Sequence, residues 1–146
     1  MATLFTQIIQ GGIPGRFVWA DQVCVAMLTI EPITPGHTMV VPRAEIEEWT
    51  QADDATVAHL MAVAKKIGQA QQAQWSARRV GVLLEGLQVP HLHVHVWPAE
   101  GPADFEVHDV EVDPAPEALD DAAERIRAHL REAGHGAYVP GPGPLP

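Results

Sequence analysis

Histidines alternate with apolar residues in the stretch His91-Leu92-His93-Val94-His95-Val96-Trp97. Alternate side chains of a β-strand point to the same face of its sheet. A strand over residues 91–97 would therefore place the three histidines on one face and Leu92, Val94 and Val96 on the other. The second face is apolar enough to pack against a helix, whereas three buried imidazoles need several polar partners. We therefore predict that the histidine face is a functional site.

The charge of these histidines limits the chemistry of their face. Three adjacent imidazolium ions would repel one another, so most of the set should be neutral near pH 7. A neutral imidazole has one nitrogen without a proton, which can act as a nucleophile or bind a metal. We favour nucleophilic catalysis by His93, because it alone has a histidine on each side. The outer two, His91 and His95, are expected to orient it and to contact phosphate.

A zinc site on the same three histidines is an alternative interpretation. Zinc held by three histidines with one open position supports hydrolysis. However, successive side chains on one face of a strand lie about 6.5–7 Å apart, whereas a tetrahedral zinc ion needs every nitrogen at about 2 Å. A chance polar strand on a wet surface is a third interpretation, which the strict alternation of three histidines disfavours.

Composition and charge restrict the partners of the protein. Its 146 residues suit one domain with a single core. The formal charge of −10 at pH 7 argues against long nucleic acids, but one nucleotide can be held by backbone amides and neutral donors. The single cysteine, Cys24, excludes an internal disulfide. No apolar run reaches membrane-spanning length and no leader pattern starts the chain, so we expect a cytoplasmic protein without membrane contact.

The order of hydrophobic periodicities predicts an α+β domain with about five strands in a largely antiparallel sheet. The expected strands are residues 17–19, 23–30, 37–41, 80–84 and 91–97. The expected helices are residues 3–10, capped by Thr3, a short piece at 44–49, a long central helix at 53–75 and a C-terminal helix capped by Asp113. One domain would span residues 1–138, and the Pro/Gly-rich residues 139–146 would form an extended, mobile tail.

The alternating run resembles the His-x-His-x-His signature of the histidine triad (HIT) family, and the likeness covers nearly the whole chain. Residues 4–9, Leu-Phe-Thr-Gln-Ile-Ile, and the following Ile13-Pro14 resemble the first helix and turn of that family. Residues 30–42, Ile-Glu-Pro-Ile-Thr-Pro-Gly-His-Thr-Met-Val-Val-Pro, resemble its segment with a fourth histidine, here His37. By residues 86–90, Gly-Leu-Gln-Val-Pro, which precede the triad, the chain resembles an actinobacterial-looking subgroup of the family. The resemblance implies a HIT-like fold.

The resemblance also implies a nucleotidyl hydrolase or transferase that cleaves at the α-phosphate of a nucleoside phosphoramidate or a (di)nucleoside polyphosphate. By position, His93 would attack phosphorus and form a nucleotidyl-histidine, which water then hydrolyses. The carbonyl of His91 would accept the proton on the other ring nitrogen of His93, His95 would contact phosphate or the leaving group, and His37 would support the set. The predicted nucleotide-binding residues are Phe5, Ile8, Met27, Thr29, Ile30, Gly86 and Gln88. We prefer a phosphoramidate, because a leaving amine needs a proton but no large second pocket.

Three residues depart from the family pattern. Thr29 stands where relatives usually carry Asp or Asn, Leu84 replaces a polar residue, and Gln88 stands where relatives often have Ser or Thr. The loop before the triad also aligns as about three residues shorter. These departures favour the main alternative, a nucleotide-binding or sensing module with little turnover.

The remaining expectations concern partners and single residues. No cofactor and no metal site are expected, although magnesium would accompany a polyphosphate substrate. A homodimer is implied by the resemblance, with the apolar stripe of the central helix as a candidate interface. Glu85 has two interpretations, a residue that acts on the leaving group and an exposed turn residue, of which the second is favoured. Trp49 is assigned to the core or an interface rather than to a ligand platform. Surface or helix-end roles are assigned to His59, His108, His129 and His135.

Overall fold

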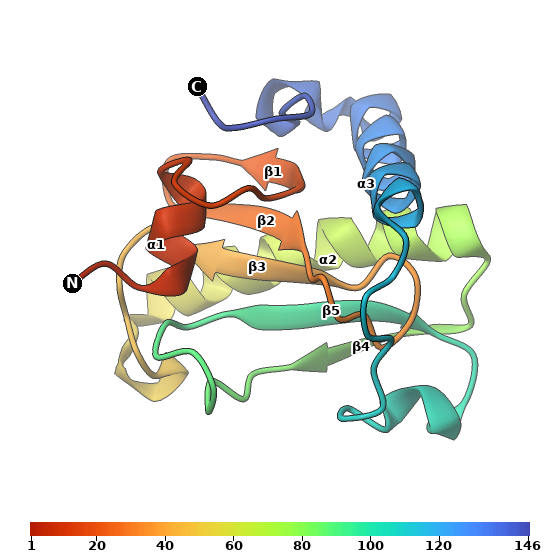
Figure 1. Ribbon diagram of the computed structural model, residues 1–146, viewed down its shortest axis with the longest axis horizontal. Helices are drawn as coiled ribbons and strands as arrows, with labels where there is room; N and C mark the ends of the chain where they lie inside the picture. The colour runs from red at the N-terminus through yellow and green to blue at the C-terminus, as the bar shows by residue number, and fades with distance from the viewer.

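One antiparallel sheet of five strands organises the protein, whose computed structural model describes all 146 residues (Figure 1). The strands are β1 (Phe17–Ala20), β2 (Cys24–Leu28), β3 (Thr38–Pro42), β4 (Arg79–Leu83) and β5 (Val94–Ala99). They lie in the order β1-β2-β3-β5-β4, and every neighbouring pair is antiparallel. The predicted α+β class and the predicted number of strands are therefore confirmed.

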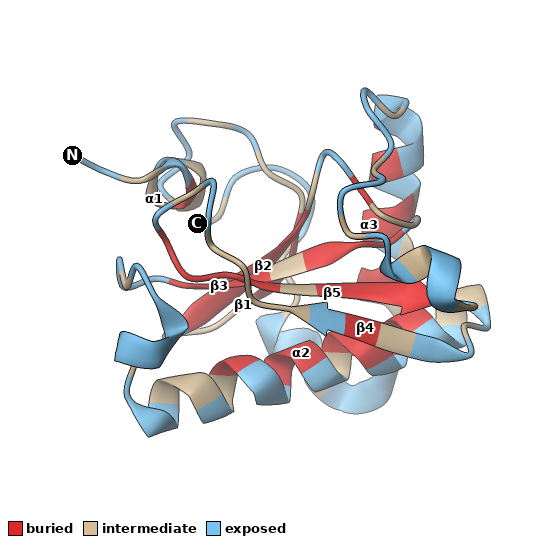
Figure 2. Cartoon of the chain, turned by 90° about the horizontal axis from the view of Figure 1, so that it is seen from below, coloured by how far each residue is buried: buried red, intermediate tan, exposed pale blue.

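A hydrophobic cluster lies on each face of the sheet. Below the sheet in Figure 2 lies the long helix α2 (Asp54–Trp75), which buries Leu60, Val63 and Ile67 in a cluster that also holds residues of α3 (Pro116–Leu130). On the opposite face, the short helix α1 (Leu4–Ile9) contributes Phe5 to a smaller cluster with Phe17, Val25, Met27 and Val41. The two faces thus have separate cores, and the candidate site lies on the face that carries α1.

Helix α2 begins where the sequence predicts, because Asp53 accepts a hydrogen bond from the amide of Thr56 at 2.7 Å and caps the first turn. Its buried residues recur at helical spacing and face the sheet. Most of the apolar stripe of α2 is therefore occupied within the monomer, although Met61 is 40% exposed, and a dimer interface on this helix stays a prediction. No helix combines the length and the apolar character needed to cross a bilayer.

Two predicted helix features are wrong. Residues 44–49 form no helix, and only a short 3₁₀ turn follows at Trp49–Gln51. The carbonyl of Ile46 instead accepts the amide of Leu92 at 2.6 Å, which holds this segment against the histidine run. At α3, Asp113 lies in the left-handed region and Ala115 precedes the helix without a side-chain cap, although Pro116 takes the first helical position as predicted.

The last residues of the chain return to the domain instead of extending from it. Leu145 packs against the cluster on the α1 face, and the C-terminus lies on the side of the molecule that carries α1 and β1 (Figure 1). The tail, residues 139–146, forms neither helix nor strand, as the sequence predicts, although Leu145 contacts the domain. Its mobility and the domain boundary at residue 138 stay predictions.

Gly81 on β4 is required by a close approach. A Cβ on this residue would overlap the ring of Trp97 on β5 and would lie 2.9 Å from Phe105. Because Trp97 is buried, Gly81→Ala should lower the free energy of unfolding by about 1–3 kcal/mol in chemical denaturation. Gly101→Ala is the matched control, since a Cβ there meets no atom within 4 Å. Equal stability of the two variants would contradict this account of the β4–β5 contact.

Candidate active site

The histidine run divides its side chains between the two faces of the sheet. Leu92, Val94 and Val96 are buried in the cluster between the sheet and α2. His93 and His95 instead line a cleft on the other face. The strand lies later in the sequence than predicted, because β5 begins at Val94, after residues 91–93, and continues past Trp97 to Ala99. The alternation nevertheless extends back to Leu92, as the sequence predicts.

His93 has one ring nitrogen bonded and one free. Its Nδ1 lies 2.7 Å from the carbonyl oxygen of His91, so we assign the proton to Nδ1, which donates to that carbonyl. No protein group bonds Nε2. The side chain is only 7% exposed, lines the cleft and meets the ring of Phe5 edge-on with 4.8 Å between centroids. A buried imidazole therefore presents an unprotonated nitrogen to the cleft.

The proton of His95 is placed by a second chain of contacts. The amide of Ile33 donates to Nδ1 of His37 at 3.0 Å, so neutral His37 carries its proton on Nε2. That nitrogen lies 2.9 Å from Nδ1 of His95 and donates to it. Neutral His95 must then carry its own proton on Nε2. The His93 and His95 rings are neighbours, with 4.8 Å between centroids, and they have opposite tautomers.

Burial keeps these imidazoles uncharged. Desolvation, together with the neighbouring His95 and His93, lowers the pKa of His37 to about 3. Desolvation and the neighbouring His93 lower the pKa of His95 to about 4. Desolvation also lowers the pKa of His93, against the opposing effect of its hydrogen bond to His91. All three are therefore neutral near pH 7, as their crowding predicts.

His91 does not reach the cleft. It is fully buried; its Nε2 donates to the carbonyl of Pro42 at 2.7 Å, and its Nδ1 accepts the hydroxyl of Thr3 at 2.6 Å. Thr3 also caps α1 by accepting the amide of Thr6. The expectation that His91 contacts phosphate is therefore wrong, because both its nitrogens are used to join α1 and β3. Its backbone carbonyl, in contrast, makes the contact with His93 that the family resemblance implies.

The cleft in front of His93 has a volume of about 650 Å³. The walls include every residue predicted to bind a nucleotide and three of the four predicted catalytic histidines: Phe5, Ile8, Met27, Thr29, Ile30, Gly86, Gln88, His37, His93 and His95. Sequence reasoning missed Val107, His108 and Val110, which lie between β5 and α3 and form another wall. The amide of Glu111 donates to the carbonyl of Pro32 and holds this segment in place. No periodic pattern marks it in the sequence.

A second cleft, of about 450 Å³, also reaches His93. It shares Glu85, Gly86, Leu87 and His93 with the first cleft. Its other walls are Glu47, Glu48, Trp49, Thr50, Leu84 and Leu92. The sequence did not predict this cleft, which Glu85 and Trp49 both line. Because Trp49 is 49% exposed, its assignment to the core is wrong, while its assignment to an interface stays a prediction.

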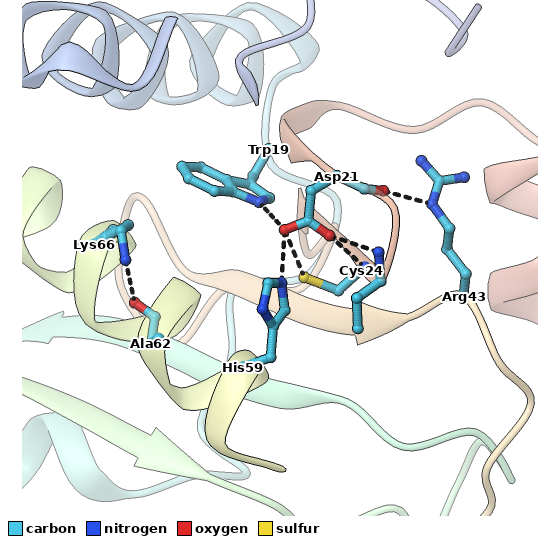
Figure 3. A network of polar contacts seen from close by, with 8 residues as sticks. Trp19, Asp21, Cys24, Arg43, His59, Ala62 and Lys66 are labelled. Atoms are coloured by element: carbon cyan, nitrogen blue, oxygen red, sulfur yellow. Dashed lines mark hydrogen bonds and ion pairs between the residues drawn. The ribbon is translucent and has the colours of Figure 1, made fainter. Parts of the chain in front are cut away.

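The three histidines of the run do not converge as metal ligands, and the one cluster of ligand-type side chains lies elsewhere. Asp21, Cys24 and His59 come together between the β1–β2 turn and α2 (Figure 3). Asp21 accepts Nε1 of Trp19 at 2.8 Å and Nε2 of His59 at 2.7 Å, and it also accepts the amides that follow it in the turn. Burial and the nearby carboxylate raise the pKa of the Cys24 thiol, which disfavours the thiolate that a metal needs. These contacts are those of a structural tie between turn and helix.

Comparisons with known proteins agree with this geometry. The family model described as the HIT domain matches residues 10–101. The protein hit of Bacillus subtilis is 30% identical over 69% of this chain and 73% of its own. A bifunctional bis(5'-adenosyl)-triphosphatase/adenylylsulfatase FHIT of Arabidopsis thaliana is 27% identical over 80% of this chain and 65% of its own.

Solved structures show the same fold. A hypothetical histidine triad nucleotide-binding protein from Sulfolobus tokodaii has a TM-score of 0.78 and 29% identity, covering 88% of this chain and 91% of its own. A Hit-like protein described as involved in cell-cycle regulation, from Bartonella henselae, has a TM-score of 0.75 and 28% identity, covering 88% of this chain and 96% of its own. Because the relatives include archaeal, bacterial and plant proteins, they do not support the actinobacterial subgroup.

The lowered histidine pKa values predict a loss of stability in mild acid. In the unfolded chain these groups titrate near their ordinary pKa of about 6.5, whereas in the folded protein the pKa is about 3 for His37 and about 4 for His95. Between these limits the unfolded state binds more protons, so the free energy of unfolding should fall as the pH falls from about 6.5 toward 4. Urea unfolding at a series of pH values should give a slope approaching two protons per molecule near about pH 5.

His37→Asn removes one of these groups and should reduce that slope by about one proton. His129→Asn, on α3 and outside both clefts, is the matched variant for the removal of a histidine. A free energy of unfolding that stays constant through this pH range would show that the histidines are not held neutral by the fold.

Proposed function

Because this chain belongs to the HIT domain family, we propose that it binds a nucleotide and cleaves the bond between the α-phosphate and a leaving group through His93. The family match and the relatives support the general class of nucleotide-binding hydrolase or transferase. The observation that carries the proposal for this chain is the free Nε2 of His93, which faces the cleft while Nδ1 is bonded to the carbonyl of His91.

In the proposed first step, the lone pair on Nε2 of His93 forms a bond to the α-phosphorus. The bond from phosphorus to the leaving group breaks, and its electron pair goes to the leaving nitrogen, which takes a proton from water. The carbonyl of His91 stabilises the positive charge on the ring, because it accepts the Nδ1 proton at 2.7 Å. The hydroxide that remains after water gives its proton to the leaving nitrogen then attacks the same phosphorus, and the electron pair of the N–P bond returns to His93. The products are a nucleoside monophosphate and a free amine.

His95 is proposed to bind the phosphate rather than to act as the nucleophile. Its contact with His37 leaves the Nε2 proton as its donor, and a neutral imidazole N–H can bond a phosphate oxygen. Phe5, Ile8, Met27 and Ile30 give the cleft an apolar end that suits a nucleobase. Thr29 offers a hydroxyl in the same cleft, and we propose that it contacts the ribose.

Within this class we propose a nucleoside phosphoramidate as the substrate. Arg16 is the only lysine or arginine in the walls of either cleft, and it is paired with Asp120 at 2.7 Å. A polyphosphate chain would need more positive charge than these walls supply, or a magnesium ion bound with the substrate. A single phosphate with a leaving amine needs less positive charge from the walls of the clefts. The homodimer and the cytoplasmic location also stay proposals.

A nucleotide-binding module with little turnover is the second candidate function. Leu84 supports it, because this side chain packs against the core cluster and offers no donor to phosphate. Incubation with an adenosine phosphoramidate distinguishes the two candidates. Release of AMP supports the enzyme, whereas calorimetric binding of the nucleotide without AMP supports the module.

His93→Ala should lower the rate of AMP release on the order of 10³-fold or more, because the lost step is covalent. Nucleotide binding, measured by calorimetry, should be largely retained, since the apolar end of the cleft is untouched. His93→Asn should behave in the same way, and His129→Ala serves as a control for an unrelated histidine. Near-normal turnover by His93→Ala would refute the mechanism.

A further inference from the structure

We propose that the second cleft binds the leaving group of the substrate and selects a leaving group that carries a positive charge. The inference rests on the proposed function, because it assigns the part of the substrate beyond the phosphorus. It names the chemical class as a nucleoside phosphoramidate whose amine carries an ammonium or guanidinium group.

The two clefts meet at the nucleophile. His93 lines both, and between them runs the loop of Glu85, Gly86 and Leu87, which also lines both. His93 is more than nine-tenths buried, and Nε2 of its ring has no protein partner. A phosphorus atom held at that nitrogen would have the nucleoside in the first cleft. The second cleft is then the open space beside His93 that is left for the leaving group.

The walls of the second cleft carry negative charge. Three of its ten lining residues are glutamates, Glu47, Glu48 and Glu85, and none is a lysine or an arginine. Glu85 is near enough to His93 to favour the charged form of its ring. Carboxylates without basic partners attract a cation and repel an anion. A second nucleotide or a polyphosphate would therefore be disfavoured in this cleft.

An aromatic side chain completes the match to a cation. Trp49 lies in the wall of the same cleft, and the residue is 49% exposed, which is unusual for so large an apolar side chain. The face of an indole ring attracts ammonium and guanidinium groups. Glutamates and an exposed tryptophan in the walls of one cleft are thus the residue types that a cationic amine requires.

Three adenosine phosphoramidates of similar chain length test this assignment. Their leaving amines would be 1,5-diaminopentane, which carries a free ammonium, pentylamine, which ends in a methyl group, and 5-aminopentanoate, which ends in a carboxylate. We expect kcat/KM for the ammonium substrate to exceed that for the methyl substrate by about fivefold or more, the effect of one or two screened ion pairs. The carboxylate substrate should be the slowest, and added salt should reduce both differences.

Variants that remove negative charge from the second cleft can be compared with variants that remove the same charge elsewhere. Glu47→Gln combined with Glu48→Gln should reduce the ratio of ammonium to methyl substrate substantially, and the preference that remains should come from Glu85 and Trp49. Glu117→Gln combined with Glu132→Gln removes the same charge from the region of α3, outside both clefts, and should keep the wild-type ratio. Trp49→Leu should also reduce the ratio, whereas Trp49→Phe should retain part of it.

The outcomes separate the two proposals. Turnover of all three substrates at equal kcat/KM by the wild-type protein would overturn the leaving-group assignment and leave the proposed hydrolysis standing. Turnover of none of them, with the protein folded and nucleotide bound, would overturn the proposed function itself. A wild-type preference that survives undiminished in the Glu47→Gln/Glu48→Gln variant would show that these carboxylates do not cause it.

Discussion

The hydrogen bond from Nδ1 of His93 to the carbonyl of His91 is the constraint on which the candidate site depends. It exists because the His91 carbonyl is not used in the sheet. The β3–β5 ladder reaches only Val40 and Val94, and the carbonyl of Pro42 on β3 accepts the His91 ring instead. The residues just before β5 are thus free to place the carbonyl of His91 against the ring of His93. The remaining nitrogen of the His93 ring then faces the clefts.

Two backbone groups and one neutral ring, rather than charged residues, decide the proton positions in the site. Ile33 orients His37, His37 orients His95, and His91 orients His93. Burial then keeps these rings neutral, so that one nitrogen of His93 can attack while one N–H of His95 can donate. The scarcity of basic side chains in both clefts fits a site that holds one phosphate by neutral donors.

Sequence alone could predict what local periodicity controls. The alternation through Leu92 and Val96, the cap at Asp53 and the apolar stripes of α2 and α3 follow from strand and helix geometry, and they are found. The contacts of Ile46 with Leu92 and of His91 with Pro42 join distant segments, so no local pattern indicates them. For the same reason the second cleft, which combines residues 47–50 with residues 84–87, was not predicted.

Long-range ¹H–¹⁵N NMR correlations of the histidine rings near pH 7 test this account most directly, because they report which nitrogen of each imidazole carries the proton. We expect His93 to be neutral with its proton on Nδ1, and His95 to be neutral with its proton on Nε2. A His93 ring with its proton on Nε2, or with protons on both nitrogens, would leave no free nitrogen toward the clefts and would contradict the account.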